Sequence, residues 1–140
     1  MFKGTNWIGV IVAGIVTWLI GALWYGMIFK DAWIAATGVD PDAAASSGMT
    51  PMILGFGIQL LIAVGMGWLV PRMADGWMGG LRTGLFSWVF LGMPVQAYGF
   101  VYMTEPMEVL PMDFGYVAVT FMLSGAIVGG LRFGPKSAPA

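Results

Sequence analysis

Few residues in this chain can do chemistry, and the commonest catalytic types are missing. Histidine and cysteine are both absent, which excludes thiolate nucleophiles, disulfides, imidazole-bound zinc or haem, and the usual proton shuttle at neutral pH. Three carboxylates, Glu105, Glu108 and Asp113, lie close together in the sequence and can in principle serve acid–base chemistry. Carboxylates in a polar connection are more often simply solvated. We therefore expect no enzymatic activity, no catalytic residue, no bound metal and no cofactor.

Two glutamines are the polar side chains of interest within the apolar segments. Gln59 and Gln96 both fall about 10–12 Å from the same membrane surface when residues are counted at about 1.5 Å each along a helix. This match predicts a hydrogen bond between them that joins two helices, worth about 0.6 kcal/mol. The alternative is that the pair lines a polar path for a solute.

Small residues recur at a spacing that places them on one helix face. Residues four apart along a helix lie nearly above one another, and small ones let a second helix approach closely. Packing within the chain is the simpler interpretation, and packing against a partner subunit is the alternative. The predicted helix-packing residues are Gly9, Ala13, Thr17 and Gly21 in the first apolar segment and Gly125 and Gly129 in the last.

The elements that carry these residues are membrane helices. The chain has 140 residues, of which 59% are hydrophobic and 9% charged, and its mean hydropathy is +0.84, whereas a soluble domain is about 25% charged. Crossing a bilayer takes about 20 apolar residues in a helix. We expect a single all-α membrane domain over residues 1–140, built as a bundle of four transmembrane helices at about 6–29, 51–70, 78–103 and 114–131.

Local signals refine this layout. Thr50-Pro51 offers a capping hydroxyl followed by proline at the first helical position, and Asp113 can cap the fourth helix in the same way. Asp40-Pro41 repeats the device and predicts a short helix in the first outer loop. Pro94 lies inside the third helix and predicts a kink there. The first helix is too long for a signal-peptide core, so we expect it to be retained.

The basic residues predict the orientation. Lysine and arginine accumulate in the cytoplasmic loops of membrane proteins, and here all but one fall on the side that carries both termini. Both termini should therefore be cytoplasmic. No basic patch suggests nucleic acid. The residues on the cytoplasmic side are Lys3, Arg72, Arg82, Arg132 and Lys136, and the exception is Lys30.

One stretch carries a family resemblance. Gly21-Ala22-Leu23-Trp24-Tyr25, followed by Phe29 and Ala32-Trp33, resembles the bacterial integral membrane protein family catalogued as domain of unknown function 1761. The usual form of that motif is Gly-Ala-Leu-Trp-Tyr-Ser-Pro, and here Gly26-Met27 replaces the last two residues. Gly115-Tyr116 resembles part of that family's last helix. The resemblance implies a four-helix bundle of undefined activity and brings no catalytic or ligand-binding residues.

These features together predict how the protein acts. We expect a non-enzymatic, multi-pass protein of the bacterial cytoplasmic (inner) membrane that acts through helix packing. It would be an accessory or structural subunit of a larger respiratory or photosynthetic complex, or a homo-oligomer. Its partners would be the lipid bilayer and other membrane helices. The alternative is a small oligomeric channel or transporter for an ion or small solute, lined by Gln59, Gln96 and the bend at Pro94.

Overall fold

The computed structural model describes residues 4–131, and every regular element within this range is helical. Three of the basic residues that predict the orientation, Lys3, Arg132 and Lys136, lie outside the described residues. Two of the longer helices contain a π-helical turn, labelled η. The elements are α1 (Trp7–Leu23), η1 (Trp24–Ile28), α2 (Lys30–Thr37), α3 (Pro41–Ser46), α4 (Thr50–Met73), α5 (Gly76–Ser87), η2 (Trp88–Gly92), α6 (Met93–Tyr102) and α7 (Leu110–Gly130).

Four helical spans are long and apolar enough to cross a membrane, as the sequence predicted. They cover Trp7–Ile28, Thr50–Met73, Gly76–Tyr102 and Leu110–Gly130. Most ends agree with the predicted ones within three residues, but the last span begins four residues earlier than predicted. Pro111 occupies its first turn, where the missing N–H of proline costs no hydrogen bond. This position of Pro111 explains the earlier start.

The caps predicted for the second and fourth spans are wrong. Thr50 is the first helical residue of α4, whose N-cap is Met49, and no side chain caps that end. Asp113 lies inside the first turn of α7 rather than before it. The side-chain cap at the start of α1 was not predicted: Asn6 Oδ1 accepts a 3.1 Å hydrogen bond from the backbone N–H of Gly9. Asparagine is a favoured N-cap residue.

A kink was predicted at Pro94, and the structure places a π turn directly before this residue. Met93 N–H bonds back to the carbonyl of Trp88, five residues earlier, and Pro94 follows in the first turn of α6. A π turn is one of the recognised ways in which a helix bends. The same device closes the first span, where Phe29 N–H donates to the carbonyl of Trp24 at 2.8 Å.

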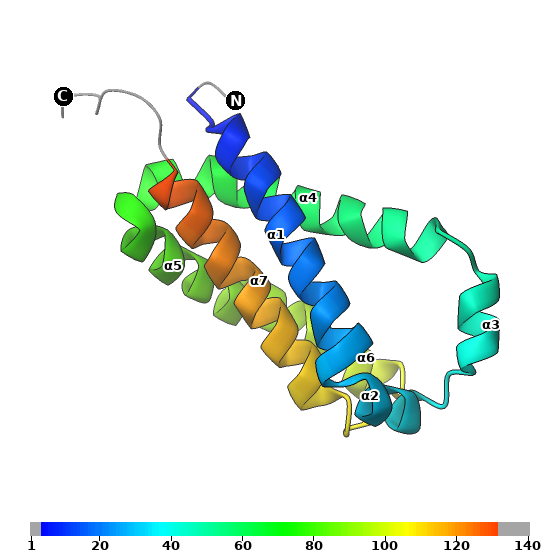
Figure 1. Cartoon of the computed structure of the whole chain (residues 1–140). Helices are drawn as coiled ribbons and strands as arrows, with labels where there is room; N and C mark the ends of the chain where they lie inside the picture. Colours follow the sequence, from blue (N-terminus) through cyan, green and yellow to red (C-terminus); the bar gives the residue numbers. More distant parts are fainter. Residues whose placement is uncertain (1–3, 132–140) are drawn as a thin grey trace.

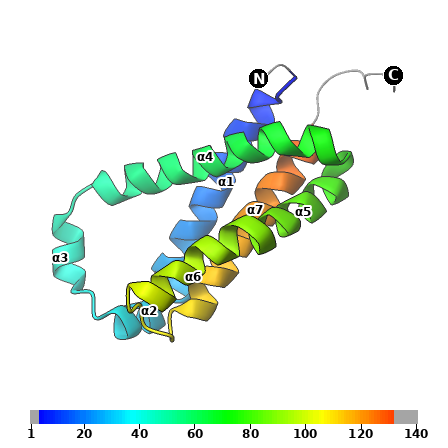
Figure 2. The same ribbon diagram turned by 180° about the vertical axis from the view of Figure 1, so that it is seen from behind.

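The helices α1, α7 and the continuous pair α5–α6 run side by side, whereas α4 crosses them at an angle (Figure 1). The view from behind shows the same divergence of α4 (Figure 2). We call the end where α1 begins and α7 finishes the Asn6 end, because Asn6 Nδ2 donates a 2.6 Å hydrogen bond to the carbonyl of Leu131 there. The opposite end, where α1 passes into η1, is the Tyr25 end.

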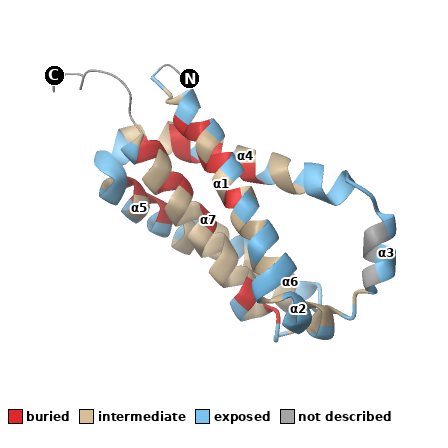
Figure 3. Ribbon diagram, viewed as in Figure 1, coloured by how far each residue is buried: buried red, intermediate tan, exposed pale blue. Residues whose placement is uncertain are grey.

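The buried core lies in the half of the bundle nearer the Asn6 end (Figure 3). In that half α4 still packs against α1 and α7, so apolar side chains from the three helices meet. Towards the Tyr25 end α4 has left the bundle, and apolar side chains are exposed instead. The buried cluster comprises Val10, Ala13, Ala63, Met66, Val70 and Val128.

The linker between the first two spans holds two short helices. The structure places α3 at Pro41–Ser46, and Asp40 Oδ1 accepts a 3.0 Å hydrogen bond from Asp42 N–H at its start. The preceding helix, Lys30–Thr37, was not predicted; it ends at Gly38, whose φ of 66° is left-handed. Glycine adopts that conformation without steric cost.

Candidate functional site

The face of α1 that carries its small residues packs against α7 of the same chain. Ala13 and Thr17 are completely buried, and a Cβ atom added at Gly9 would lie 3.3 Å from the α7 backbone. At the other end of this face the phenol of Tyr116 lies directly over Gly21. Tyr116 Oη also donates a 3.3 Å hydrogen bond to the carbonyl of Thr17. Any larger residue at position 21 would displace that ring.

The face of α7 that carries Gly125 and Gly129 packs against α5. The carbonyl oxygens of Gly80 and Gly76 lie against Gly125 and Gly129 so closely that an added Cβ atom would overlap them. Backbones approach this closely only where side chains are absent. The predicted packing residues of α1 and α7 therefore lie in seams inside the bundle.

The two glutamines do not form the predicted pair. Gln96 Nε2 donates a 3.1 Å hydrogen bond to the main-chain carbonyl of Asp113. Gln96 Oε1 in turn accepts a 3.4 Å hydrogen bond from Trp88 Nε1. Gln59 is buried in α4, and its Oε1 has no hydrogen-bond partner. Equal depth along two helices did not bring the side chains together because α4 diverges from α6.

One set of open small residues lies on α4. Gly57 and Gly65 have no atom of another element within 4 Å of an added Cβ atom, and Leu61, on the same face between them, is 74% exposed. Leu54 and Ile58 flank them and are exposed as well. We call these five residues the α4 open face. Their spacing of three and four residues makes them one continuous stripe opposite the buried side of the helix.

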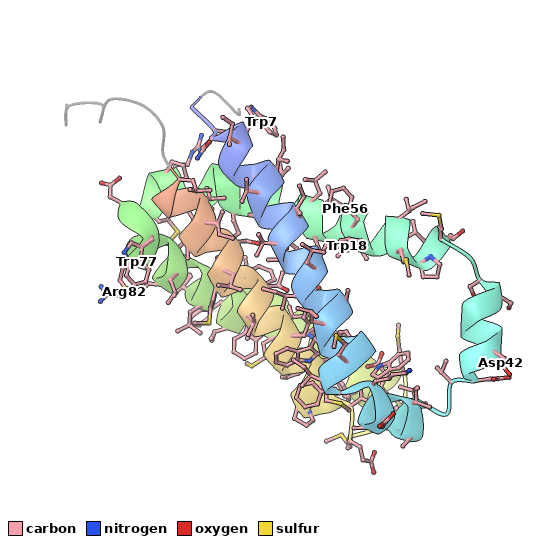
Figure 4. The ribbon with its side chains drawn as sticks, viewed as in Figure 1. Trp7, Trp18, Asp42, Phe56, Trp77 and Arg82 are labelled. Atoms are coloured by element: carbon pink, nitrogen blue, oxygen red, sulfur yellow. The ribbon has the colours of Figure 1, made fainter. Side chains whose placement is uncertain are left out.

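The first half of α4 is exposed on more than this stripe. Met52, Ile53 and Leu54 are each exposed by at least 60%. Its main support is Trp18 of α1, whose ring meets that of Phe56 edge-on at 6.0 Å between centroids (Figure 4). Trp18 Nε1 also donates a 3.2 Å hydrogen bond to the carbonyl of Met52. A single tryptophan thus bridges the widening gap between α1 and α4.

The motif Gly21-Ala22-Leu23-Trp24-Tyr25, which carries the family resemblance, joins the first span to the last. Tyr25 Oη donates a 2.6 Å hydrogen bond to Asp113 Oδ1, and Trp24 Nε1 donates one of 3.1 Å to the carbonyl of Met112. The ring of Tyr25 also meets that of Tyr116 edge-on at 5.3 Å. The motif therefore anchors η1 to the first turn of α7.

The three neighbouring carboxylates fall into two places. Glu105 and Asp113 line one hollow of about 460 Å³ at the Tyr25 end. Glu108 borders another, of about 330 Å³, beside α2. Within residues 4–131 no group of three or more carboxylate, imidazole or thiol side chains is placed to hold a metal ion.

Sequence reasoning missed the α4 open face and the Tyr25–Asp113 contact. A helical projection of residues 54–65 would have shown the stripe, because Gly57 and Gly65 are two turns apart with Leu61 between them. The Tyr25–Asp113 contact has no local signal, since its partners are 88 residues apart.

Comparison with known proteins identifies a family. A family model described as "Protein of unknown function (DUF1761)" matches residues 8–129. No curated protein and no solved structure matches the chain.

Proposed function

The chain belongs to the DUF1761 family, whose function is unknown, and we propose that it is a non-enzymatic membrane protein that acts by packing against another membrane helix. The observation that carries this proposal is the α4 open face. The partner we propose is the same face of a second copy of the chain.

The composition of the open face supports helix contact over lipid contact alone. A glycine costs a helix about 1 kcal/mol relative to alanine, and lipid chains gain nothing from it. Glycines on an outward face instead allow a second backbone to come close, where van der Waals packing drives association in a membrane. Gly57 and Gly65 have this placement and are open.

The pattern is also self-complementary. Small residues at 57 and 65 alternate with the large, exposed Leu54 and Leu61. A leucine of one copy can therefore lie over a glycine of the other. A two-fold axis would repeat each contact, and two-fold dimers are the commonest homo-oligomers. An accessory role in a larger respiratory or photosynthetic complex would use this face for a different helix.

The channel alternative finds less support in the geometry of the chain. Gln96 is held by Trp88 and by the Asp113 carbonyl, and Pro94 is exposed on the outside of the bundle. Gln59, Gln96 and Pro94 thus do not line one path within the described chain. We do not propose this function.

The proposal includes a location and an orientation. We infer that the protein lies in a bacterial cytoplasmic membrane with its Asn6 end in the cytoplasm. Arg72 lies in the last turn of α4, and Arg82 projects outward from α5 near Trp77 (Figure 4). Lys30 begins α2 at the Tyr25 end. This distribution follows the preference of basic residues for the cytoplasmic side.

The mass of the detergent-extracted protein tests the proposal. Native mass spectrometry of the full chain should give a dimer that the double variant Gly57→Leu/Gly65→Leu converts to monomer. Bulky side chains on the open face would keep the backbones apart without touching the core. A wild-type protein that is monomeric and copurifies with nothing would refute the proposal.

A further inference from the structure

The hollow at the Tyr25 end is lined by residues of α6, of the connection to α7 and of the first turn of α7. Its volume of about 460 Å³ falls within the range of sites for small ligands. Its lining combines polar residues with aromatic and apolar ones. The residues that matter to its chemistry are Gln96, Tyr98, Phe100, Met103, Glu105 and Asp113.

Glu105 is positioned in this hollow by the backbone beneath it. A Cβ atom added at Gly99 would lie 2.7 Å from Oε1 and 2.9 Å from Oε2 of Glu105. The carboxylate therefore rests on the bare backbone of α6, where only glycine leaves space. The N–H of Glu105 also donates to the carbonyl of Gly99 at 3.4 Å.

Asp113 is held by hydrogen bonds from two other spans. Its Oδ1 accepts the hydrogen bond of Tyr25, and its main-chain carbonyl accepts that of Gln96. One side-chain oxygen of Asp113 is thus fixed by the protein, and Asp113 is among the residues that line the hollow. The hollow presents two carboxylates, and none of the described residues that line it is a lysine or an arginine.

Two aromatic residues also line the hollow. The ring of Tyr98 stacks on that of Tyr102 at 5.3 Å, and Phe100 meets Phe114 edge-on at 5.7 Å. Carboxylates attract a cation, and aromatic rings add to that attraction when the cation is an organic ammonium. Anions are repelled. Small metal ions prefer a complete shell of oxygen ligands, which this largely apolar wall does not offer.

We propose that this hollow binds the ammonium group of an organic amine between Glu105, Asp113 and the rings of Tyr98 and Phe100. The apolar part of such a molecule would lie along Val95 and Met103, which are 71% and 74% exposed beside the hollow. The ammonium comes either from a lipid headgroup or from a soluble amine. This site goes beyond the α4 open face and does not depend on it.

Two probes distinguish the sources. Ethylammonium chloride is titrated into the purified full chain, with sodium chloride at equal ionic strength as the reference. In parallel, the chain is placed in nanodiscs of phosphatidylglycerol with or without an equal share of phosphatidylethanolamine. The thermal unfolding midpoint reports binding, since a ligand of the folded state stabilises it. A gain with the lipid amine identifies a headgroup site, and a gain with ethylammonium alone identifies a site for a soluble amine.

Matched variants test the residues. Glu105→Gln should weaken binding of the effective probe about fivefold, an effect of the size expected for one charged contact near the surface. Glu108→Gln makes the same change in charge outside this hollow and should bind like the wild type. Gly99→Ala keeps every charge but displaces the Glu105 carboxylate, and it should weaken binding as well. The proposal is overturned if neither probe stabilises the chain beyond its reference, or if the two glutamate variants behave alike.

Discussion

The phenol of Tyr25 donates a 2.6 Å hydrogen bond to Asp113 Oδ1 and so ties the end of the first span to the start of the last. Its neighbour Trp24 reaches the same turn of α7 through the carbonyl of Met112. With Gln96 bound to the main chain of Asp113, three spans meet at this one residue. Asp113 is therefore the junction that holds the Tyr25 end of the bundle together.

Tyr25→Phe should lower the free energy of unfolding by about 2 kcal/mol, because a hydrogen bond to a carboxylate is worth about 1.5–3 kcal/mol. The measurement is denaturant unfolding in detergent micelles. Tyr102→Phe is the matched control, since Tyr102 is 73% exposed and its ring stacking on Tyr98 survives loss of the hydroxyl. Equal stability of the two variants would show that the Tyr25 bond contributes nothing.

Gly125→Ala should destabilise the bundle by about 1–3 kcal/mol, as overpacking of a tight interface does. The added methyl group would meet the carbonyl of Gly80, so α5 and α7 must separate. Gly55→Ala in α4 is the control, because its added Cβ atom meets nothing and alanine favours the helix. Thermal unfolding of both proteins gives the comparison, and a fully stable Gly125→Ala would contradict the observed α5–α7 seam.

The same substitution at the two glutamines should have opposite effects. Gln59→Met removes a buried carbonyl oxygen that has no partner and should raise the free energy of unfolding by about 1 kcal/mol. Gln96→Met removes the bonds to Asp113 and Trp88 and should lower it by about 1–2 kcal/mol. Unfolding in micelles measures both. Destabilisation of similar size at both positions would mean that Gln59 has a partner after all.

Labelling of introduced cysteines tests the proposed orientation, and the absence of native cysteine makes each label specific. A membrane-impermeant maleimide should modify Asp42→Cys in intact spheroplasts and Met73→Cys only after lysis. Asp42 and Met73 are both exposed, so side-chain burial does not explain a difference. The reverse pattern would invert the orientation.

Sequence reasoning reached the local features and missed those that depend on distant contacts. The four spans follow from length and apolarity, which act within each segment. The start of α7 was misplaced because Asp113 was assigned a local role, as a cap, while its carboxylate is engaged by Tyr25. The glutamine pair was misjudged because depth along a helix says nothing about the direction in which the helix leans.

The α4 open face was likewise invisible to a search for close glycine repeats. Gly57 and Gly65 are eight residues apart, and their significance appears only when α1 and α7 are seen to use their own small faces internally. Which small residues remain for a partner is a property of the assembled bundle, so sequence spacing alone could not decide it.

Disulfide cross-linking through α4 tests the proposed function most directly. Gly57→Cys is made in the otherwise cysteine-free chain and oxidised in native membranes. The control is Leu91→Cys, which is 62% exposed on η2. Association through the α4 open face predicts a covalent dimer of twice the chain mass at position 57 and none at position 91. No dimer at position 57, or equal dimer at both positions, would contradict it.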